Sequence, residues 1–173
     1  MDRNAIHTAL LRNHEAFLCC IADLPGTKRT TSRNGKWSPA QQLDHILRSV
    51  RPVNMAMGLP LWFLRIAFGK PNRPARSYEG LVQRYQEKLA TGGRASGRFV
   101  PPAAPSSSVQ QMSTTLRDLI KRLSARVDRW SDEDLDNTLL PHPLLGKLTV
   151  REMLFFTIHH VQHHQRLVER DSA

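Results

Sequence analysis

The chain has 173 residues, of which 40% are hydrophobic and 23% charged, a composition that fits one globular domain over residues 1–173. The most apolar run, LPLWFLRIAF, is far shorter than a membrane span of about 20 residues, and the first residues lack the apolar core of a signal peptide, so we expect a cytoplasmic protein without a membrane partner. The formal net charge of +10 favours anionic ligands, but no helix-turn-helix, zinc-finger or RNA-binding pattern accompanies it, so nucleic acid is not favoured as a partner.

The first predicted helix covers residues 3–24. Apolar residues recur every three or four positions along it, and the Pro-Gly pair at 25–26 ends it. It carries the chain's two cysteines, Cys19 and Cys20. Adjacent cysteines form a disulfide only with strain, so we expect reduced thiols that are buried on the helix.

A second helix is predicted to begin in the sequence WSPAQQ. Ser38 has the side chain of an N-cap, Pro39 suits the first helical position, and Gln41 completes a capping box. We expect Pro52 to kink or end this helix, because proline removes a backbone donor and crowds the preceding turn.

Residues 58–100 supply +6 of the net charge. They contain a short apolar helix candidate over 61–68, a proline-rich turn, and an amphipathic segment over 78–90. A basic segment of this kind attracts a phosphorylated or carboxylated small molecule as well as other anions.

Two further helices follow. The third is predicted over residues 109–130, and the fourth opens at LTVRE, where Thr149 and Glu152 form a second capping box, and continues to the C-terminus. No alternation typical of strands is present. We therefore predict an all-α four-helix bundle in which a long crossover, containing short extra helices, connects the second and third helices and lets them run parallel.

The segment FFTIHHVQHHQRLV at 155–168 carries four of the eight histidines. Each helical residue advances by about 100° around the axis, which places His160 and His164 within the apolar arc and His159 and His163 on the charged side. The first pair is therefore predicted to be buried and the second to be exposed to solvent.

His160 and His164 lie four residues apart, the spacing at which two imidazoles of one helix can bind the same metal ion. Neutral imidazole suits zinc, nickel, copper and ferrous iron. The competing interpretation is a pair of core histidines that are hydrogen-bonded to other groups. A metal site would also need at least one ligand from elsewhere in the chain.

Periodicity leaves four candidates for that further ligand. His14 lies nearest to the apolar stripe of the first helix, and His7 lies at the edge of that stripe. His45 lies off the stripe of the second helix, where a helical wheel would expose it, and His142 belongs to a loop. The pattern does not choose among them.

Three segments resemble the DinB-like superfamily of four-helix metalloproteins, which includes bacillithiol-transferase and mycothiol-dependent isomerase branches. They are WSPAQQLDHI, FGKPNRP and HPLLGKLTVREMLFFTIHHVQHH. The first matches a Trp-Ser/Thr pair followed by a histidine in the second helix, and the third matches His-x3-His in the fourth helix. The resemblance implies a DinB-type bundle.

The resemblance also implies a metal held by His45, His160 and His164. The ion is expected to be a divalent transition metal, zinc or nickel first, with iron or manganese as alternatives. One departure lies at Leu167, where relatives often carry glutamine or histidine. A substrate contact at that position is therefore expected to be absent here.

The implied function is that of a metal-dependent enzyme acting on a small molecule. The leading hypothesis is a transferase that activates an anionic low-molecular-weight thiol, with Arg65–Arg98 holding its charged groups. One alternative is a hydrolase that uses metal-bound water, and another is a non-catalytic, stress-associated metal-binding module.

Exposed apolar helix faces would allow a homodimer. No catalytic base stands out, since Asp44 is as easily a surface residue, and Trp62, Tyr78 and Tyr85 are candidates either for the cleft wall or for the core.

Overall fold

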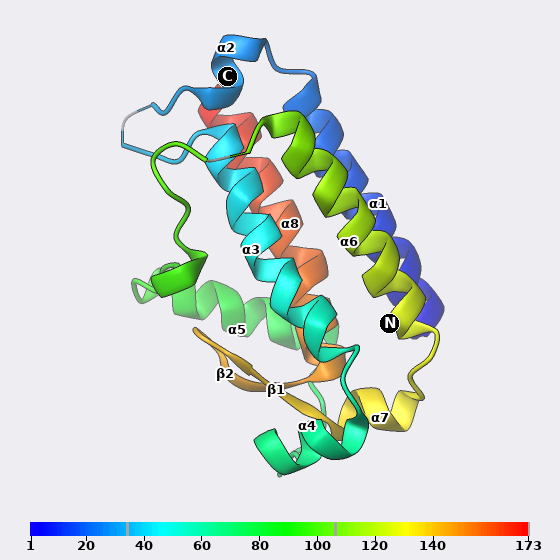
Figure 1. Cartoon of the computed structure of the whole chain (residues 1–173). Helices are drawn as coiled ribbons and strands as arrows, with labels where there is room; N and C mark the ends of the chain where they lie inside the picture. Colours follow the sequence, from blue (N-terminus) through cyan, green and yellow to red (C-terminus); the bar gives the residue numbers. More distant parts are fainter. Residues whose placement is uncertain (34, 106, 173) are drawn as a thin grey trace.

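Four long helices lie side by side in the computed structural model, which describes residues 1–33, 35–105 and 107–172. Helix α1 contacts α6 and α8, and α3 contacts the same two helices. In Figure 1, α3 and α6 run in one direction, whereas α1 and α8 run in the opposite direction. The expectation of a mostly helical bundle is confirmed. The bounds are Arg3–Ala22 for α1, Pro39–Ala56 for α3, Val109–Val127 for α6 and Val150–Ser172 for α8.

Local sequence sets where these helices begin. The Ser38 hydroxyl accepts from the Gln41 amide while the Gln41 side chain accepts from the Ser38 amide, which is the predicted capping box of α3. Thr149 and Glu152 make the same reciprocal pair at the start of α8. Both helices that carry the candidate metal ligands therefore begin at positions fixed by their own side chains.

Pro52 was expected to kink or end the second helix, and it does not end it. Helix α3 continues for one turn beyond it, to Ala56. Val53 on this last turn and Met57, which directly follows it, are buried in the core. Their burial offsets the backbone hydrogen bond that proline cannot donate.

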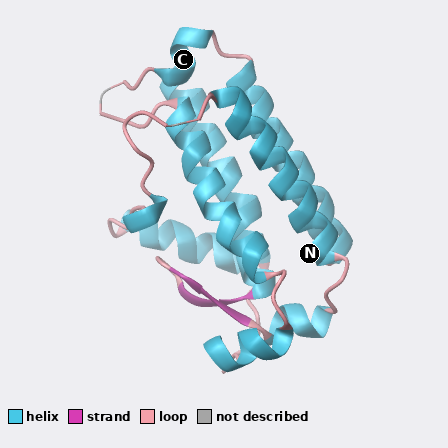
Figure 2. Ribbon diagram, viewed as in Figure 1, coloured by secondary structure: helices cyan, strands magenta, loops and turns pink. Residues whose placement is uncertain are grey.

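Short elements occupy the connections between the long helices, and Figure 2 shows that nearly all of them are helical. Among the described residues, the β structure is a single hairpin, which contradicts the expectation of no strands. Its strands pair antiparallel with Leu140 opposite Leu148, and Gly146 takes the positive φ of 78° needed beside the turn. The elements are α2 (Gly26–Thr30), α4 (Leu61–Phe68), α5 (Tyr78–Ala90), η1 (Gly97–Phe99), α7 (Asp132–Asn137), β1 (Leu139–His142) and β2 (Gly146–Thr149).

The core fills the space between the four long helices and extends under the hairpin and α4. Both cysteines are free thiols, but Cys19 is exposed and Cys20 is only half-buried, so the expectation of buried thiols is wrong. They lie near the end of α1, where its stripe of core residues is carried by Phe17, Leu18 and Ile21 instead. None of the described helices combines the length and the apolar character required to cross a bilayer.

Candidate metal centre

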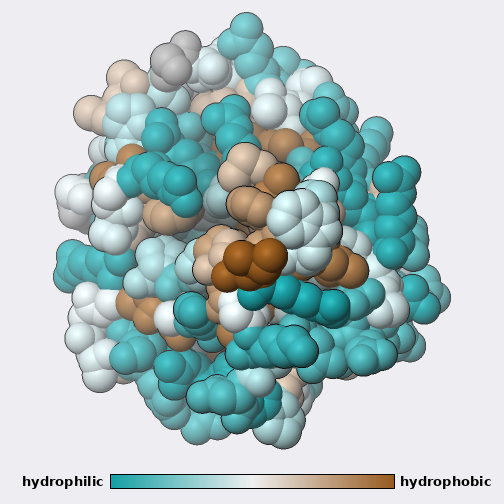
Figure 3. Space-filling view, turned by 60° about the horizontal axis from the view of Figure 1, so that its bottom comes forward, coloured by the Kyte–Doolittle hydropathy of each residue, from teal (hydrophilic) through white to brown (hydrophobic). Residues whose placement is uncertain are grey.

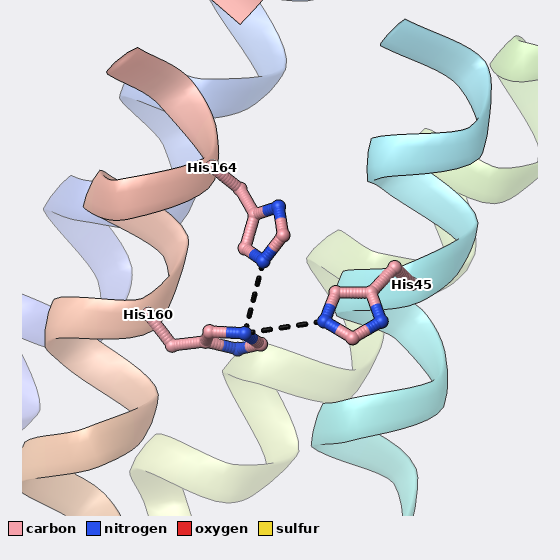
Figure 4. Close-up of side chains that lie close together, drawn as sticks. All are labelled: His45, His160 and His164. Carbon is pink, nitrogen blue, oxygen red and sulfur yellow. Dashed lines mark hydrogen bonds between the residues drawn. The ribbon is translucent and has the colours of Figure 1, made fainter. Parts of the chain in front are cut away.

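Three imidazole rings from two helices meet at one point (Figure 4). His45 belongs to α3, and His160 and His164 belong to α8. The Nε2 atom of His160 lies 3.2 Å from Nε2 of His45 and 3.0 Å from Nε2 of His164. All three rings are buried, and their ligand atoms lie within 4.8 Å of one another. The structure thus brings together the three histidines that the resemblance implied.

The separations of these nitrogens fit a shared ion. A tetrahedral zinc with Zn–N bonds of about 2.0–2.1 Å holds two ligand nitrogens about 3.3–3.4 Å apart. The two short Nε2–Nε2 distances are within a few tenths of an ångström of that value. Three neutral imidazoles form a nitrogen donor set suited to zinc, nickel, iron or copper.

Two of the rings are oriented by hydrogen bonds on their far sides. Nδ1 of His45 donates to the backbone oxygen of Phe99 over 2.6 Å, and Nδ1 of His164 donates to the side-chain oxygen of Gln42. A ring that carries its hydrogen on Nδ1 has a bare lone pair on Nε2. These acceptors therefore turn the coordinating nitrogens of both rings toward the shared point, as outer partners do in known metal sites.

Burial keeps these histidines neutral. It lowers the pKa of His160 and of His164 well below 6.5, and the neighbouring histidines add to the shift. Burial also lowers the pKa of His45, although its hydrogen bond to Phe99 and the nearby Asp44 act in the other direction. At neutral pH the three rings are in the protonation state that a metal ligand requires.

His45 is buried even though it lies off the apolar stripe of its helix. The segment around η1 covers it, and this segment is tied to α3 at three points. Phe99 accepts from His45, the Arg98 oxygen accepts from Arg48 over 3.2 Å, and the Pro102 oxygen accepts from Gln41 over 3.0 Å. A helical wheel considers one helix alone and does not include such a cover, which is why it predicted exposure.

The prediction that His159 is exposed is also wrong, because α5 packs on that side of α8. The His159 ring is 6% exposed and lies edge-on to Tyr78 and Tyr85. His163 is half-buried, with its ring against those of Tyr85 and His164. Helix α5, which belongs to the long connection between α3 and α6, thus covers the face of α8 that was predicted to be exposed to solvent.

The other three histidine candidates lie outside the cluster. His7 faces Asp128 near the surface, with 3.3 Å between Nδ1 and Oδ2. His14 is buried as its wheel position predicted, but its Nδ1 donates to the Leu10 oxygen and its Nε2 has no partner among the described residues. In His142, Nδ1 accepts from two backbone amides of the hairpin turn and is not free to bind a metal.

The three histidines line a large open cleft of about 1420 Å³. Apolar side chains form most of its wall, and they continue onto the exposed face over α4 that Figure 3 shows in brown. Basic side chains line another part of the cleft, including Arg94, Arg98 and Arg170. Leu167 also lines the cleft and gives it an apolar surface at the position where the resemblance predicts a polar residue.

Tyr85 is the one of the three aromatic candidates that lines this cleft. Tyr78 packs on Phe155 and His159, and Trp62 is 65% exposed on α4. Asp44 accepts from Arg48 over 2.7 Å and does not reach the cleft. Among the described residues, Asp171 is the carboxylate that lines the cleft, and it is paired with Lys36 and Arg170.

The sequence reasoning missed the two acceptors behind the histidines. Gln42 had a readable signal, because it lies three residues before His45 and therefore on the same side of α3. The Phe99 oxygen gives no signal in the sequence, because every residue carries a backbone carbonyl.

The chain was compared with known protein families and structures. The model of the DinB superfamily matches residues 9–168. The chain belongs to the DinB superfamily. A solved structure of YfiT from Bacillus subtilis, described as a probable metal-dependent hydrolase with an unusual four-helix bundle topology, superimposes with a TM-score of 0.66 at 16% identity, covering 98% of this chain and 85% of YfiT. Among curated proteins, none matches significantly. At this identity the likeness to YfiT shows a shared fold for this DinB superfamily member.

Proposed function

We propose that this DinB superfamily protein, as a single domain over residues 1–173, is a metal-dependent hydrolase of small molecules whose ion is held by His45, His160 and His164. The observation that carries the proposal is the convergence of three neutral Nε2 atoms at the wall of a large open cleft. The description of YfiT, which shares the fold, as a probable metal-dependent hydrolase supports it.

The residues present fit such an ion in number, donor type and spacing. When bound, a divalent ion supplies a Lewis acid and lowers the pKa of water at its open position toward neutrality. Because all three ligands are neutral, they leave the ion its full charge. Zinc and nickel are the first candidates, and iron and manganese are the alternatives.

Aromatic rings border the candidate metal ligands within the cleft. The Phe156 ring stacks on His160 at 4.6 Å between centroids, and the Trp37 ring lies 5.0 Å from that of His45. Both residues line the cleft, so they would give a bound ion apolar surroundings, in which electrostatic interactions are stronger than in water. The open part of the cleft leaves room for a substrate.

Metal content and turnover test the proposal together. Purified wild-type protein is expected to contain about one divalent ion per chain by elemental analysis, and His45→Ala and His160→Ala are expected to lose it. His7→Ala is the matched control, because His7 lies outside the cluster and should retain the metal. Metal retained by both ligand variants would rule out the proposed site.

A thiol transferase is the second candidate, and the basic side chains of the cleft favour it. Arg94 and Arg98 are exposed and line the cavity, where they would attract the carboxylates of a low-molecular-weight thiol. The two functions differ in their requirements. A hydrolase turns over ester or amide substrates without added thiol, whereas a transferase turns over an electrophile only when the thiol is present.

A further inference from the structure

His142 ends strand β1, and its ring is fixed by the turn that follows. Its Nδ1 accepts from the backbone amides of Leu144 and Leu145 over 3.1 and 3.0 Å. A nitrogen that accepts two N–H groups carries no hydrogen of its own, so the hydrogen of the neutral ring is on Nε2. The turn therefore determines the tautomer of His142.

The ring lies close to the candidate metal centre. Its centroid is 4.2 Å from that of Phe156, and the Phe156 ring also stacks on that of His160, at 4.6 Å. The His142 and His160 rings thus contact the same aromatic ring. Burial also lowers the pKa of His142 to about 4, so the ring is neutral at physiological pH.

The Nε2 hydrogen of His142 has no acceptor among the described residues, although every other polar feature of the ring is satisfied. His142 lines the cleft together with Leu140, Leu144 and Met153. A donor without a partner in an apolar wall is a specific recognition element, because a ligand oxygen placed there gains a hydrogen bond that the protein does not otherwise provide.

We infer that His142 binds the substrate, its Nε2–H donating to an oxygen of an ester or amide whose apolar acyl part lies against the leucine-lined wall. This inference rests on the proposed hydrolase function and assigns its substrate class. His142 would thus be a fourth histidine of the site, one that binds substrate and not the metal. The role of His142 is to position an acyl oxygen beside the ion by a neutral donor of fixed direction.

Two substitutions test the two ring nitrogens one at a time, because each keeps the role of one nitrogen and removes that of the other. In His142→Asn, the side-chain oxygen occupies the place of Nδ1 and accepts from the turn amides, but the Nε2 donor is lost. In His142→Gln, the amide nitrogen reaches the place of Nε2, but the acceptor for the turn is lost. If His142 binds the substrate, His142→Asn loses more activity than His142→Gln. If His142 only stabilises the hairpin, His142→Gln is the more strongly impaired variant.

For hydrolysis of a short-chain acyl ester by the metal-loaded protein, we expect His142→Asn to lose about three- to tenfold in kcat/KM with an unchanged melting temperature and metal content. His142→Gln is expected to lose thermal stability yet keep more of the activity. Wild-type kcat/KM in His142→Asn would overturn the inference. Absence of hydrolysis in the wild type would instead contradict the proposed function, so the two failures are distinguishable.

A second measurement does not depend on turnover. In ¹⁵N NMR of the histidine rings, Nδ1 of His142 is expected to resonate as an unprotonated nitrogen and Nε2 as a protonated one. Titration with butyrate, which carries an oxygen acceptor on an apolar chain, should shift the Nε2–H signal in a saturable way and bind about threefold or more weakly to His142→Asn. A ring protonated on Nδ1, or equal butyrate affinity in both proteins, would refute the contact.

Discussion

His164 donates its Nδ1 hydrogen to the side-chain oxygen of Gln42, so a residue of α3 orients a candidate metal ligand that belongs to α8. Gln42 is itself buried, with 4% of its surface exposed. The two helices that supply the three nitrogens are therefore connected by this hydrogen bond as well as by the proposed ion.

Replacing Gln42 with leucine is expected to weaken metal binding about 10- to 100-fold, because the His164 ring loses the acceptor that fixes its tautomer and direction. Leucine has a similar volume, so packing changes little. Competition with a chromophoric chelator measures the affinity. Gln42→Glu keeps an acceptor and should bind at least as tightly as the wild type, and a Gln42→Leu affinity equal to wild type would show that the contact has no role in binding.

Glu152 joins the start of α8 to the segment before α5. Its fully buried carboxylate accepts from the Arg73 guanidinium at 2.7 and 2.9 Å, from the Arg76 amide at 2.8 Å and from the Thr149 amide at 3.0 Å. Burial alone would raise the pKa of Glu152, but these hydrogen bonds outweigh it and lower the pKa below 4.5. The stabilisation is therefore present above the carboxyl pKa of the unfolded chain and disappears as the pH falls below it.

We expect Glu152→Gln to reduce the free energy of unfolding at pH 7 by about 2–3 kcal/mol, measured by urea denaturation. The matched control is Glu15→Gln. Glu15 pairs with Arg117 over 2.8 Å, but its side chain is 49% exposed, so the loss should stay below about 1 kcal/mol. Equal losses in the two variants would mean that the buried network contributes no more than a surface pair.

His14 makes the protein sensitive to acid. Burial lowers its pKa to about 4, against about 6.5 in the unfolded chain, so between these values the unfolded state binds a proton that the native state excludes. The contribution of His14 to stability is therefore constant above about pH 6.5 and decreases as the pH falls toward 4. In the presence of a chelator, His14→Leu should lose about 2–3 kcal/mol less than the wild type between pH 7.5 and 4.5. Identical losses in chemical denaturation would disprove this role.

Helix α4 offers a direct comparison of two aliphatic residues two positions apart. Leu64 is fully buried, whereas Ile66 is 78% exposed on the apolar face. Leu64→Ala is expected to cost about 2–5 kcal/mol of stability through lost burial and a cavity. Ile66→Ala should change it by less than about 0.5 kcal/mol. Thermal unfolding of both variants checks the difference, and similar melting temperatures would contradict the docking of α4.

Features that depend on a few neighbouring residues could be predicted from the sequence. The caps at Ser38 and Thr149 are local pairs, and the inward direction of His160 and His164 follows from the helical repeat. The strands could not be predicted because each has only four residues, too few for an alternating pattern, and β1 contains Pro141.

Burial caused by distant segments was not readable either. His45 is covered by η1, which lies more than fifty residues further along the chain, and His159 is covered by α5. Only the family resemblance selected His45, because a wheel of α3 alone points it toward solvent. The covering segments belong to the long connection, where periodicity predicts helices but not the surface on which they pack.

The acceptor behind His45 is a peptide oxygen, and this gives the site an uneven tolerance to mutation. Exchange of the side chain at position 99 leaves that oxygen in the backbone, whereas exchange of Gln42 deletes the other acceptor outright. In a library of single substitutions scored for bound zinc, most changes at position 99 should therefore retain the metal, whereas most changes at position 42 should lose it. Both positions nevertheless provide the hydrogen-bond acceptor that orients a histidine.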